Sequence, residues 1–196
     1  MKWKHLLVLG SLCAALIYAG SGLLLAHLRY WRSHNRPAPF GLHADILVSP
    51  GSIGIPGITK MYSAELTNYG VFPVRVTRCE FIDDTATPGA MVLYRAERQL
   101  RPQDGWETIA DFAKHCKPYP TVFGSTRLVE RLVWPGESLG TGSEATAARD
   151  SVNKGDFIRF VLYLDAARPG ANTIATDSIG IDESPEDRGI GYRVRH

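Results

Sequence analysis

The feature that most constrains this chain is an apolar run from Leu6 to Leu28 that contains no Asp, Glu, Lys or Arg. As an α-helix its 23 residues would extend about 34 Å, whereas the hydrocarbon core of a bilayer is roughly 30 Å thick. Basic residues flank the run on both sides, namely Lys2, Lys4, Arg29, Arg32 and Arg36. The run therefore predicts a transmembrane signal-anchor helix at residues 6–28, preceded by a short cytoplasmic N-terminus at residues 1–5.

Two other interpretations of this leader stay open. A cleaved signal peptide would have its apolar core at Leu6–Leu16 and a small-residue exit at Ile17–Ala19, but cleavage there would leave Leu23–Leu28 exposed. A lipoprotein signal would use Cys13, although the bulky Leu12 precedes it where small residues are usual. The uncleaved anchor is favoured because apolar residues continue past both sites.

The flanking charges do not decide the orientation of the anchor, because basic residues occur on both sides of the run. Two later features favour export of the C-terminal part: its β-rich pattern and the two cysteines outside the run, Cys79 and Cys116. We therefore expect a single-pass membrane protein that meets membrane lipid through its N-terminal helix and carries an extracytoplasmic C-terminal domain.

The charge of the chain argues against nucleic acid as a partner. The formal net charge is +2, and all 20 acidic residues and 20 of the 22 basic ones lie from Arg29 onward. The exported part is therefore neutral, whereas a surface that binds phosphate backbones normally shows a basic excess or stripe. The basic cluster of Arg29, Arg32 and Arg36 is better explained as a signal that sets the helix end, or as a contact to anionic headgroups.

Composition divides the residues after the anchor into three segments. Residues 29–42 are interrupted by two prolines and a glycine, which predicts a juxtamembrane stalk. Residues 43–165 suffice for one domain with its own core. Residues 166–196 contain few apolar side chains, and we expect them to form a mobile tail except around Ile190–Val194.

Alternation of apolar and polar residues predicts an all-β domain at residues 43–165. The clearest strand is Lys60–Asn68, in which Tyr62, Ala64 and Leu66 share one face. We expect this strand to form a hairpin with Val71–Ile82 through the turn Asn68-Tyr69-Gly70. We also expect Ser138–Ala148 and Asp156–Leu164 to form a closing hairpin whose second strand is the most buried of the domain.

Two segments fit either a strand or a helix. In residues 104–115, Asp104 and Glu107 have the spacing of a capping box, but the Asp104-Gly105 turn favours a strand. Thr126–Trp134 also has apolar residues at helical spacing, yet it is short and stops at Pro135-Gly136, a typical pair for a type II turn. We favour strands at both places.

Several turn sequences resemble those of the immunoglobulin-like sandwiches of cell-envelope proteins. The segments that carry the resemblance are Leu66-Thr67-Asn68-Tyr69-Gly70, Pro135-Gly136-Glu137 and Lys154-Gly155-Asp156-Phe157. The resemblance covers residues 44–165. It implies an immunoglobulin-like antiparallel β-sandwich, here preceded by a single N-terminal transmembrane helix.

Two short motifs suggest catalysis or metal binding. Gly136-Glu137-Ser138-Leu139-Gly140 matches the G-x-S-x-G nucleophile elbow, but the one histidine after Ser138 is the terminal His196, so a turn is the simpler explanation. His115-Cys116 has the residue types of a metal site or an activated thiol, which Cys79 would complete. A small envelope enzyme that uses Ser138 or His115-Cys116 is therefore the alternative hypothesis.

Cys79 and Cys116 are better explained as a disulfide, because they are the only cysteines outside the apolar run in a domain that we place in an oxidising compartment. No motif requires a cofactor or a metal. By elimination we expect a membrane-anchored extracytoplasmic binding or scaffolding module without catalytic activity. Its expected partner is another envelope protein, which the sequence does not identify.

Overall fold

The computed structural model describes residues 2–50, 60–82, 89–111, 125–141, 152–165, 167–168, 171–182 and 188–190. His115 and Cys116 lie outside these residues. The chain divides into two compact units. The helix unit comprises Met1–His43, Thr67–Val74 and Leu132–Ser138, and the sheet unit comprises Ala44–Leu66, Arg75–Arg131 and Leu139–His196.

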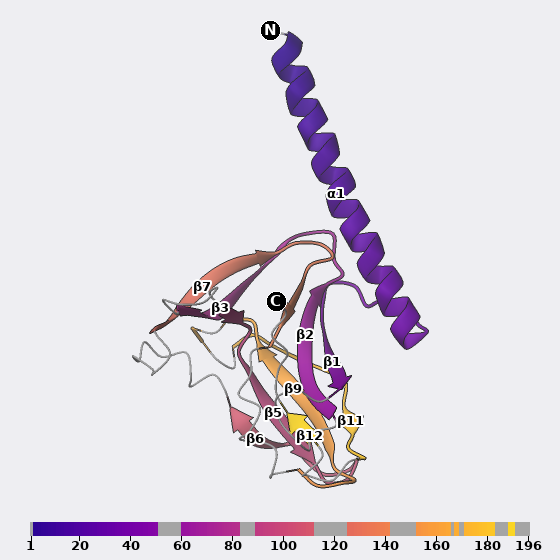
Figure 1. Ribbon diagram of the computed structural model, residues 1–196, viewed down its shortest axis with the longest axis vertical. Helices are drawn as coiled ribbons and strands as arrows, with labels where there is room; N and C mark the ends of the chain where they lie inside the picture. Colours follow the sequence, from indigo (N-terminus) through magenta and orange to yellow (C-terminus); the bar gives the residue numbers. More distant parts are fainter. Residues whose placement is uncertain are drawn as a thin grey trace. The chain divides into compact units, whose positions relative to one another are not determined.

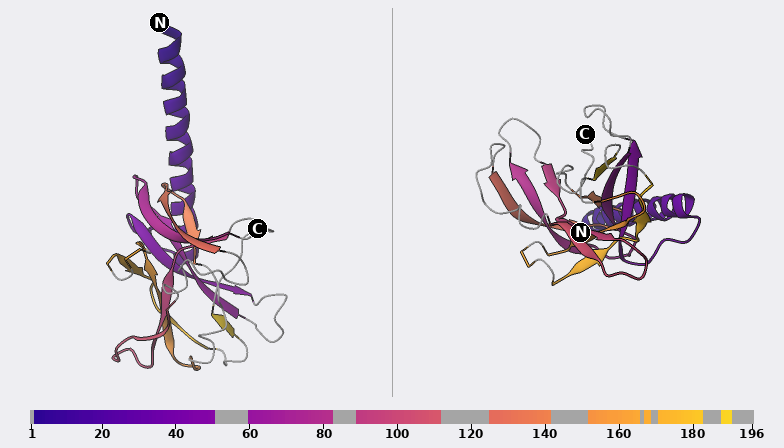
Figure 2. Two further views of the ribbon diagram at one scale, coloured as in Figure 1. Left: turned by 90° about the vertical axis from the view of Figure 1, so that its left-hand side faces the viewer. Right: turned by 90° about the horizontal axis from the view of Figure 1, so that it is seen from below.

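Helix α1 (Lys2–His34) is continuous over its 33 residues (Figure 1; Figure 2, left). It ends where Asn35 takes a positive φ of 52° and donates its N–H to the Trp31 carbonyl at 2.8 Å. Asparagine tolerates this left-handed conformation, which stops the helix. The segment predicted as a stalk, residues 29–42, therefore begins as a continuation of α1.

The membrane-spanning helix predicted at residues 6–28 falls within α1. Among the residues that the structure describes, no helix combines the length and the apolar character needed to cross a membrane. A span at residues 6–28 stays a prediction from the sequence.

The rest of the described chain contains twelve strands in three sheets, most of them paired antiparallel (Figure 1). One sheet has the order β1 (Leu42–Pro50), β2 (Lys60–Asn68), β12 (Arg188–Ile190), with β8 (Ser138–Gly140) also paired to β2. A second has the order β10 (Thr173–Ala175), β9 (Phe157–Tyr163), β5 (Tyr94–Gln99), β6 (Glu107–Asp111), with β11 (Ile179–Gly180) also paired to β9. The third has the order β4 (Gly89–Met91), β3 (Val74–Ile82), β7 (Ser125–Val133). This architecture confirms the all-β prediction.

Strand β9 is the centre of the second sheet. It pairs with the whole of β5, from Tyr94 opposite Leu162 to Gln99 opposite Phe157. Ile158, Phe160 and Leu162 share one face because successive strand residues point to opposite sides, and all three are fully buried. Burial of a side chain such as Phe160 contributes roughly 1.5–3 kcal/mol. Five of the seven residues of β9 are buried, as expected of a core strand, but β2 is buried to a similar extent among its described residues, so β9 is not singled out as the most buried strand.

Two predicted hairpins are wrong. The strand β2 has the predicted bounds, but β3 does not pair with it, since the two belong to different sheets. The predicted closing hairpin fails in the same way, because β8 pairs with β2 whereas β9 pairs with β5, β10 and β11. At these two places, consecutive strands therefore cross between sheets instead of turning back on themselves.

The strand-or-helix choices at residues 107–111 and 125–133 are confirmed as strands β6 and β7. The expected tail is wrong for the described residues 171–182 and 188–189. There, β10 and β11 extend the sheet antiparallel to β9, and β12 pairs parallel with β2. Short strands with few apolar residues are stabilised here by backbone hydrogen bonds to strands that already belong to the core.

Candidate functional site

The helix unit contains a cluster that we call the helix–loop junction: residues 22–34 of α1 with the loops 67–74 and 132–138. Ala26 and Tyr30, one turn apart on α1, are buried against Tyr69. The rings of Tyr30 and Tyr69 meet edge to face with their centroids 5.3 Å apart, a favourable aromatic geometry. His27 adds a contact between its Nε2 and the Tyr69 carbonyl oxygen at 3.2 Å. The loop is therefore packed on the second half of the helix.

Histidine and arginine side chains surround the two tyrosines. The Tyr30 ring stacks on His34 with centroids 4.1 Å apart, and His43 meets Tyr30 edge to face at 5.7 Å. The guanidinium carbon of Arg36 lies 5.8 Å from the centre of the Tyr30 ring, within the range of a cation–π contact. The end of the helix is thus rich in groups that are cationic or become cationic on protonation.

Asn68 joins the two loops of the junction. Its fully buried side chain donates to the carbonyls of Phe72 (2.8 Å) and Val133 (2.9 Å) and accepts from the N–H of Gly70 (2.9 Å). Its backbone also pairs with Gly136 and Glu137. Because these bonds use all the hydrogen-bonding groups of the amide except one acceptor position, Asn68 sets the relative position of the two loops.

The second loop is a type II turn, as predicted. The N–H of Glu137 donates to the Trp134 carbonyl at 2.9 Å, and Gly136 has a φ of +79°, which the third residue of this turn requires. Gly136 also approaches α1 closely, since a Cβ placed on it would overlap the backbone of Gly22 and Leu23. The turn packs on the helix backbone because Gly136 lacks a side chain.

The junction leaves large apolar side chains uncovered. Phe72 is 76% exposed and Trp134 is 57% exposed, and Val71 and Phe40 are also exposed. The Asn68 amide holds the main chains of Phe72 and Val133, so the tips of the two loops lie next to each other. A contiguous exposed apolar patch commonly marks an interaction surface.

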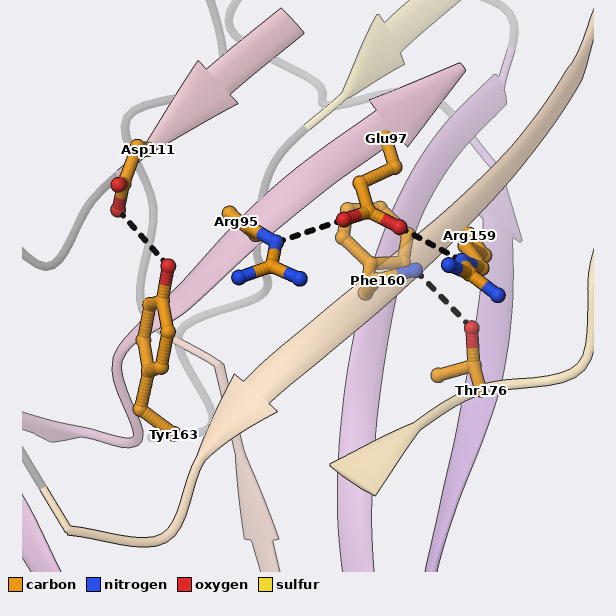
Figure 3. A network of polar contacts seen from close by, with 7 residues as sticks. All are labelled: Arg95, Glu97, Asp111, Arg159, Phe160, Tyr163 and Thr176. Carbon is orange, nitrogen blue, oxygen red and sulfur yellow. Dashed lines mark hydrogen bonds and ion pairs between the residues drawn. The ribbon is translucent and has the colours of Figure 1, made fainter. Parts of the chain in front are cut away.

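A second polar cluster lies in the sheet unit (Figure 3). Glu97 of β5 is only 4% exposed, and its two carboxylate oxygens accept from the Nε of Arg95 (2.6 Å) and of Arg159 (2.7 Å). The guanidinium of Arg159 lies 4.2 Å from the centre of the Trp106 ring. The hydrogen bond to Glu97 is the main cause that raises the pKa of Arg95. With a guanidinium on each oxygen, Glu97 joins Arg95 and Arg159 in one ion-pair cluster.

The same face continues to Tyr163 and Asp111, which come from β9 and β6 (Figure 3). The Tyr163 hydroxyl donates to Asp111 Oδ1 at 3.3 Å. Burial is the largest cause that raises the pKa of the Tyr163 phenol, and the Asp111 carboxylate adds to it against the opposing effect of Arg95. On β9, the Phe160 N–H donates to Thr176 Oγ1 at 3.0 Å and anchors the segment after β10. These contacts connect β9 to β6 and to the segment that follows β10.

The Glu97 cluster yields a test of its structural role. Glu97→Ala is expected to destabilise the protein by about 2 kcal/mol, because it leaves two guanidiniums without their carboxylate. This is less than for a fully buried pair, since both arginines reach water. The matched control is Glu107→Ala, which removes a mostly exposed carboxylate paired with Arg98 in the same sheet and should cost under about 0.5 kcal/mol. Chemical denaturation measures both; equal effects would contradict the structural role of Glu97.

The residues predicted for chemistry are not brought together within the described chain. Ser138 begins β8, and its Oγ lies 2.8 Å from the Oγ1 of Thr67, a hydroxyl rather than a base. His115 and Cys116 lie outside the described residues, so the thiol or metal hypothesis stays untested there. Within the described residues, no group of three or more His, Cys, Asp or Glu side chains has the arrangement of a metal site.

Cys79 is fully buried in β3, where it lies opposite Met91 of β4. Among the described cysteines, Cys13 alone is a free thiol. The bridge between Cys79 and Cys116 stays a prediction, because Cys116 lies outside the described residues.

Sequence reasoning missed both clusters that the structure contains. Two signals were present: Ala26, Tyr30 and His34 recur every four residues, which marks one face of a helix, and Arg95 and Glu97 share one face of a strand. Neither pattern shows which distant residue completes the cluster. Comparisons with family models, with curated proteins and with solved structures found no match.

Proposed function

We propose that the chain is a non-enzymatic binding or scaffolding module that α1 holds at a membrane, with the C-terminal domain on the extracytoplasmic side. The observation that carries this proposal is the exposure of large apolar side chains on the first half of α1, where Leu7, Leu16 and Ile17 are each at least 67% exposed. A helix that is apolar on all sides is stable in lipid or inside a larger protein. The second half of α1 instead packs against loops of its own chain.

We further propose that residues 43–165 form an immunoglobulin-like sandwich. The crossing of β2 and β3 into different sheets supports this arrangement, since two-sheet sandwiches connect consecutive strands in this way. The bridge between Thr77 and Asp165 supports it further, because it connects β3 to the segment that follows β9 of another sheet.

The partner is another envelope protein, and β7 is the edge that suits it. This nine-residue strand is the last in its sheet and pairs with β3 alone among the described strands. An unpaired edge of this length presents N–H and C=O groups that accept a strand from a partner. Leu128, exposed on β7, adds an apolar contact beside this edge. The exposed Ser138, hydrogen-bonded to Thr67, gives no comparable support to the hydrolase alternative.

Site-specific photo-crosslinking tests the proposed function. A photoreactive amino acid at Leu128 is expected to capture one defined protein in native membranes, because this side chain lies on the proposed edge. The matched control replaces Leu100, which is also an exposed leucine of the sheet unit but lies in the loop after β5. Capture of the same products from both positions, or from neither, would contradict an interface at β7. A hydrolase activity that Ser138→Ala abolishes would favour the enzymatic alternative instead.

A further inference from the structure

We propose that the two loop tips of the helix–loop junction, Val71–Phe72 and Trp134, bind an anionic lipid surface beside α1. The inference rests on the proposed anchoring of the chain by α1 and adds a second membrane contact to it. It follows from the position of the loops along the helix, from the side chains at their tips and from the distribution of charge.

The loops pack against a defined stretch of α1. The turn at Pro135-Gly136 meets the helix backbone at Gly22, and Tyr69 meets Ala26 and Tyr30. At about 1.5 Å per residue, these contacts occupy roughly 12 Å of helix length. They begin inside the apolar run that ends at Leu28.

This position brings the loops to the level of the membrane surface. A helix crosses a hydrocarbon core of about 30 Å with about 20 residues, so a span that begins at Leu6 reaches Leu25. Gly22 then lies within the last turn of the span. The turn that contacts Gly22 is therefore held at the boundary between the hydrocarbon core and the headgroups.

The side chains at the tips suit this boundary. Trp134 and Phe72 are exposed, and the Asn68 amide holds their loops together. Tryptophan is enriched at membrane interfaces because its ring is apolar on one side and carries a polar N–H. On a surface in contact with water these side chains have no partner, whereas in the headgroup layer their apolar area is covered.

The basic and acidic residues are distributed unevenly between the two units, and the excess of basic residues lies in the helix unit. The helix unit contains five Lys and Arg residues and one acidic residue, Glu137, whereas the sheet unit contains the other 17 basic and 19 acidic residues. The formal charges are therefore +4 and −2. Lys2 and Lys4 lie at the far end of α1, so the end that carries the loops has Arg29, Arg32 and Arg36 against Glu137, a formal charge of +2. Arg29 and Arg32 are exposed on α1 on either side of Tyr30, which contacts Tyr69. A cationic unit with aromatic tips fits an anionic lipid surface, to which each nearby Lys or Arg adds roughly 1 kcal/mol.

Depth-dependent fluorescence quenching tests the proposal on the full chain. An environment-sensitive dye is attached to a cysteine that replaces Phe72, Trp134, Leu16 or Leu100 in a Cys13→Ser background, in vesicles of phosphatidylglycerol and phosphatidylcholine. All four replaced side chains are exposed, so the labels do not disturb the core. We expect lipids with a shallow quencher to reduce the dye emission at positions 72 and 134 at least twofold. Lipids with a deep quencher should reduce the emission at position 16. Neither kind of lipid should reduce the emission at position 100. The shallow quenching should increase with the share of phosphatidylglycerol.

The controls separate the two proposals. Quenching at Leu16 without quenching at positions 72 and 134 would overturn the inference and leave the anchor intact. A lack of quenching at Leu16 would overturn the anchoring on which the inference rests. If the dyes at positions 72 and 134 were shielded in native membranes but not in lipid vesicles, the inference would also be overturned. The two loop tips would then be assigned to a protein partner.

Discussion

Reduction of the exported protein is expected to lower its melting temperature by roughly 10 °C, if Cys79 and Cys116 are joined. The two residues are 37 positions apart, and a bridge that closes such a loop restricts the unfolded chain by roughly 4 kcal/mol. For a domain of this size, each kcal/mol corresponds to about 2–4 °C. Cys79 is fully buried in β3, so the bridge would attach the segment around Cys116 directly to a core strand.

Thiol labelling tests the bridge between Cys79 and Cys116 directly, because it detects the cysteines that are not joined. In unreduced, denatured protein isolated from its own compartment, Cys13 should be the one reactive thiol, since it is the free cysteine among those described. A Cys13→Ser variant is the control and should bind no label. Two additional reactive thiols would contradict the bridge, remove the argument for an oxidising compartment, and favour the thiol or metal alternative at His115-Cys116.

Gly136→Ala is expected to destabilise the helix–loop junction by about 3 kcal/mol. Two effects add: an L-residue at a φ of +79° costs roughly 1–2 kcal/mol, and the new methyl group overlaps the Gly22 backbone at a cost of about 1–3 kcal/mol. The neighbouring atoms belong to the main chain of a helix, which cannot move aside as a flexible side chain does. Denaturation in detergent micelles, monitored by tryptophan fluorescence, measures the change.

Two other glycines of the helix unit separate these effects. Gly41 has a φ of +91° and no atom near its missing Cβ, so Gly41→Ala should cost about 1 kcal/mol from backbone conformation alone. A Cβ at Gly22 would lie 3.6 Å from the Pro135 carbonyl oxygen, an ordinary contact, so Gly22→Ala should be tolerated. If Gly136→Ala cost no more than Gly41→Ala, the turn would not be closed against α1 in solution.

The sequence by itself determined the local structure. Strand β2 has the bounds Lys60–Asn68 that the alternation of Tyr62, Ala64 and Leu66 indicated, because a period of two places these side chains on one face of a strand. The type II turn at Pro135-Gly136 was equally readable, since proline restricts φ at one position and glycine permits a positive φ at the next. Each of these features depends on residues within a few positions of one another.

Only the tertiary structure decided which strands pair. Nothing in the residues of β2 and β3 showed that they enter different sheets, or that β10 and β11, with few apolar side chains, attach to β9. Backbone hydrogen bonds are nearly the same for every sequence, so the partner of a strand depends on how the whole core is filled.

Packing between distant segments is also the reason why the sequence did not predict the Glu97 cluster or the helix–loop junction. Glu97 is close to Arg95 in the sequence, but Arg159 reaches it only because β9 lies beside β5 in one register. Gly22 and Gly136 are each unremarkable as single glycines, and their close approach exists only after a turn and a helix, over 100 residues apart, have packed together. The sequence determined the residues and the local conformations, whereas packing between distant segments determined which of them form a site.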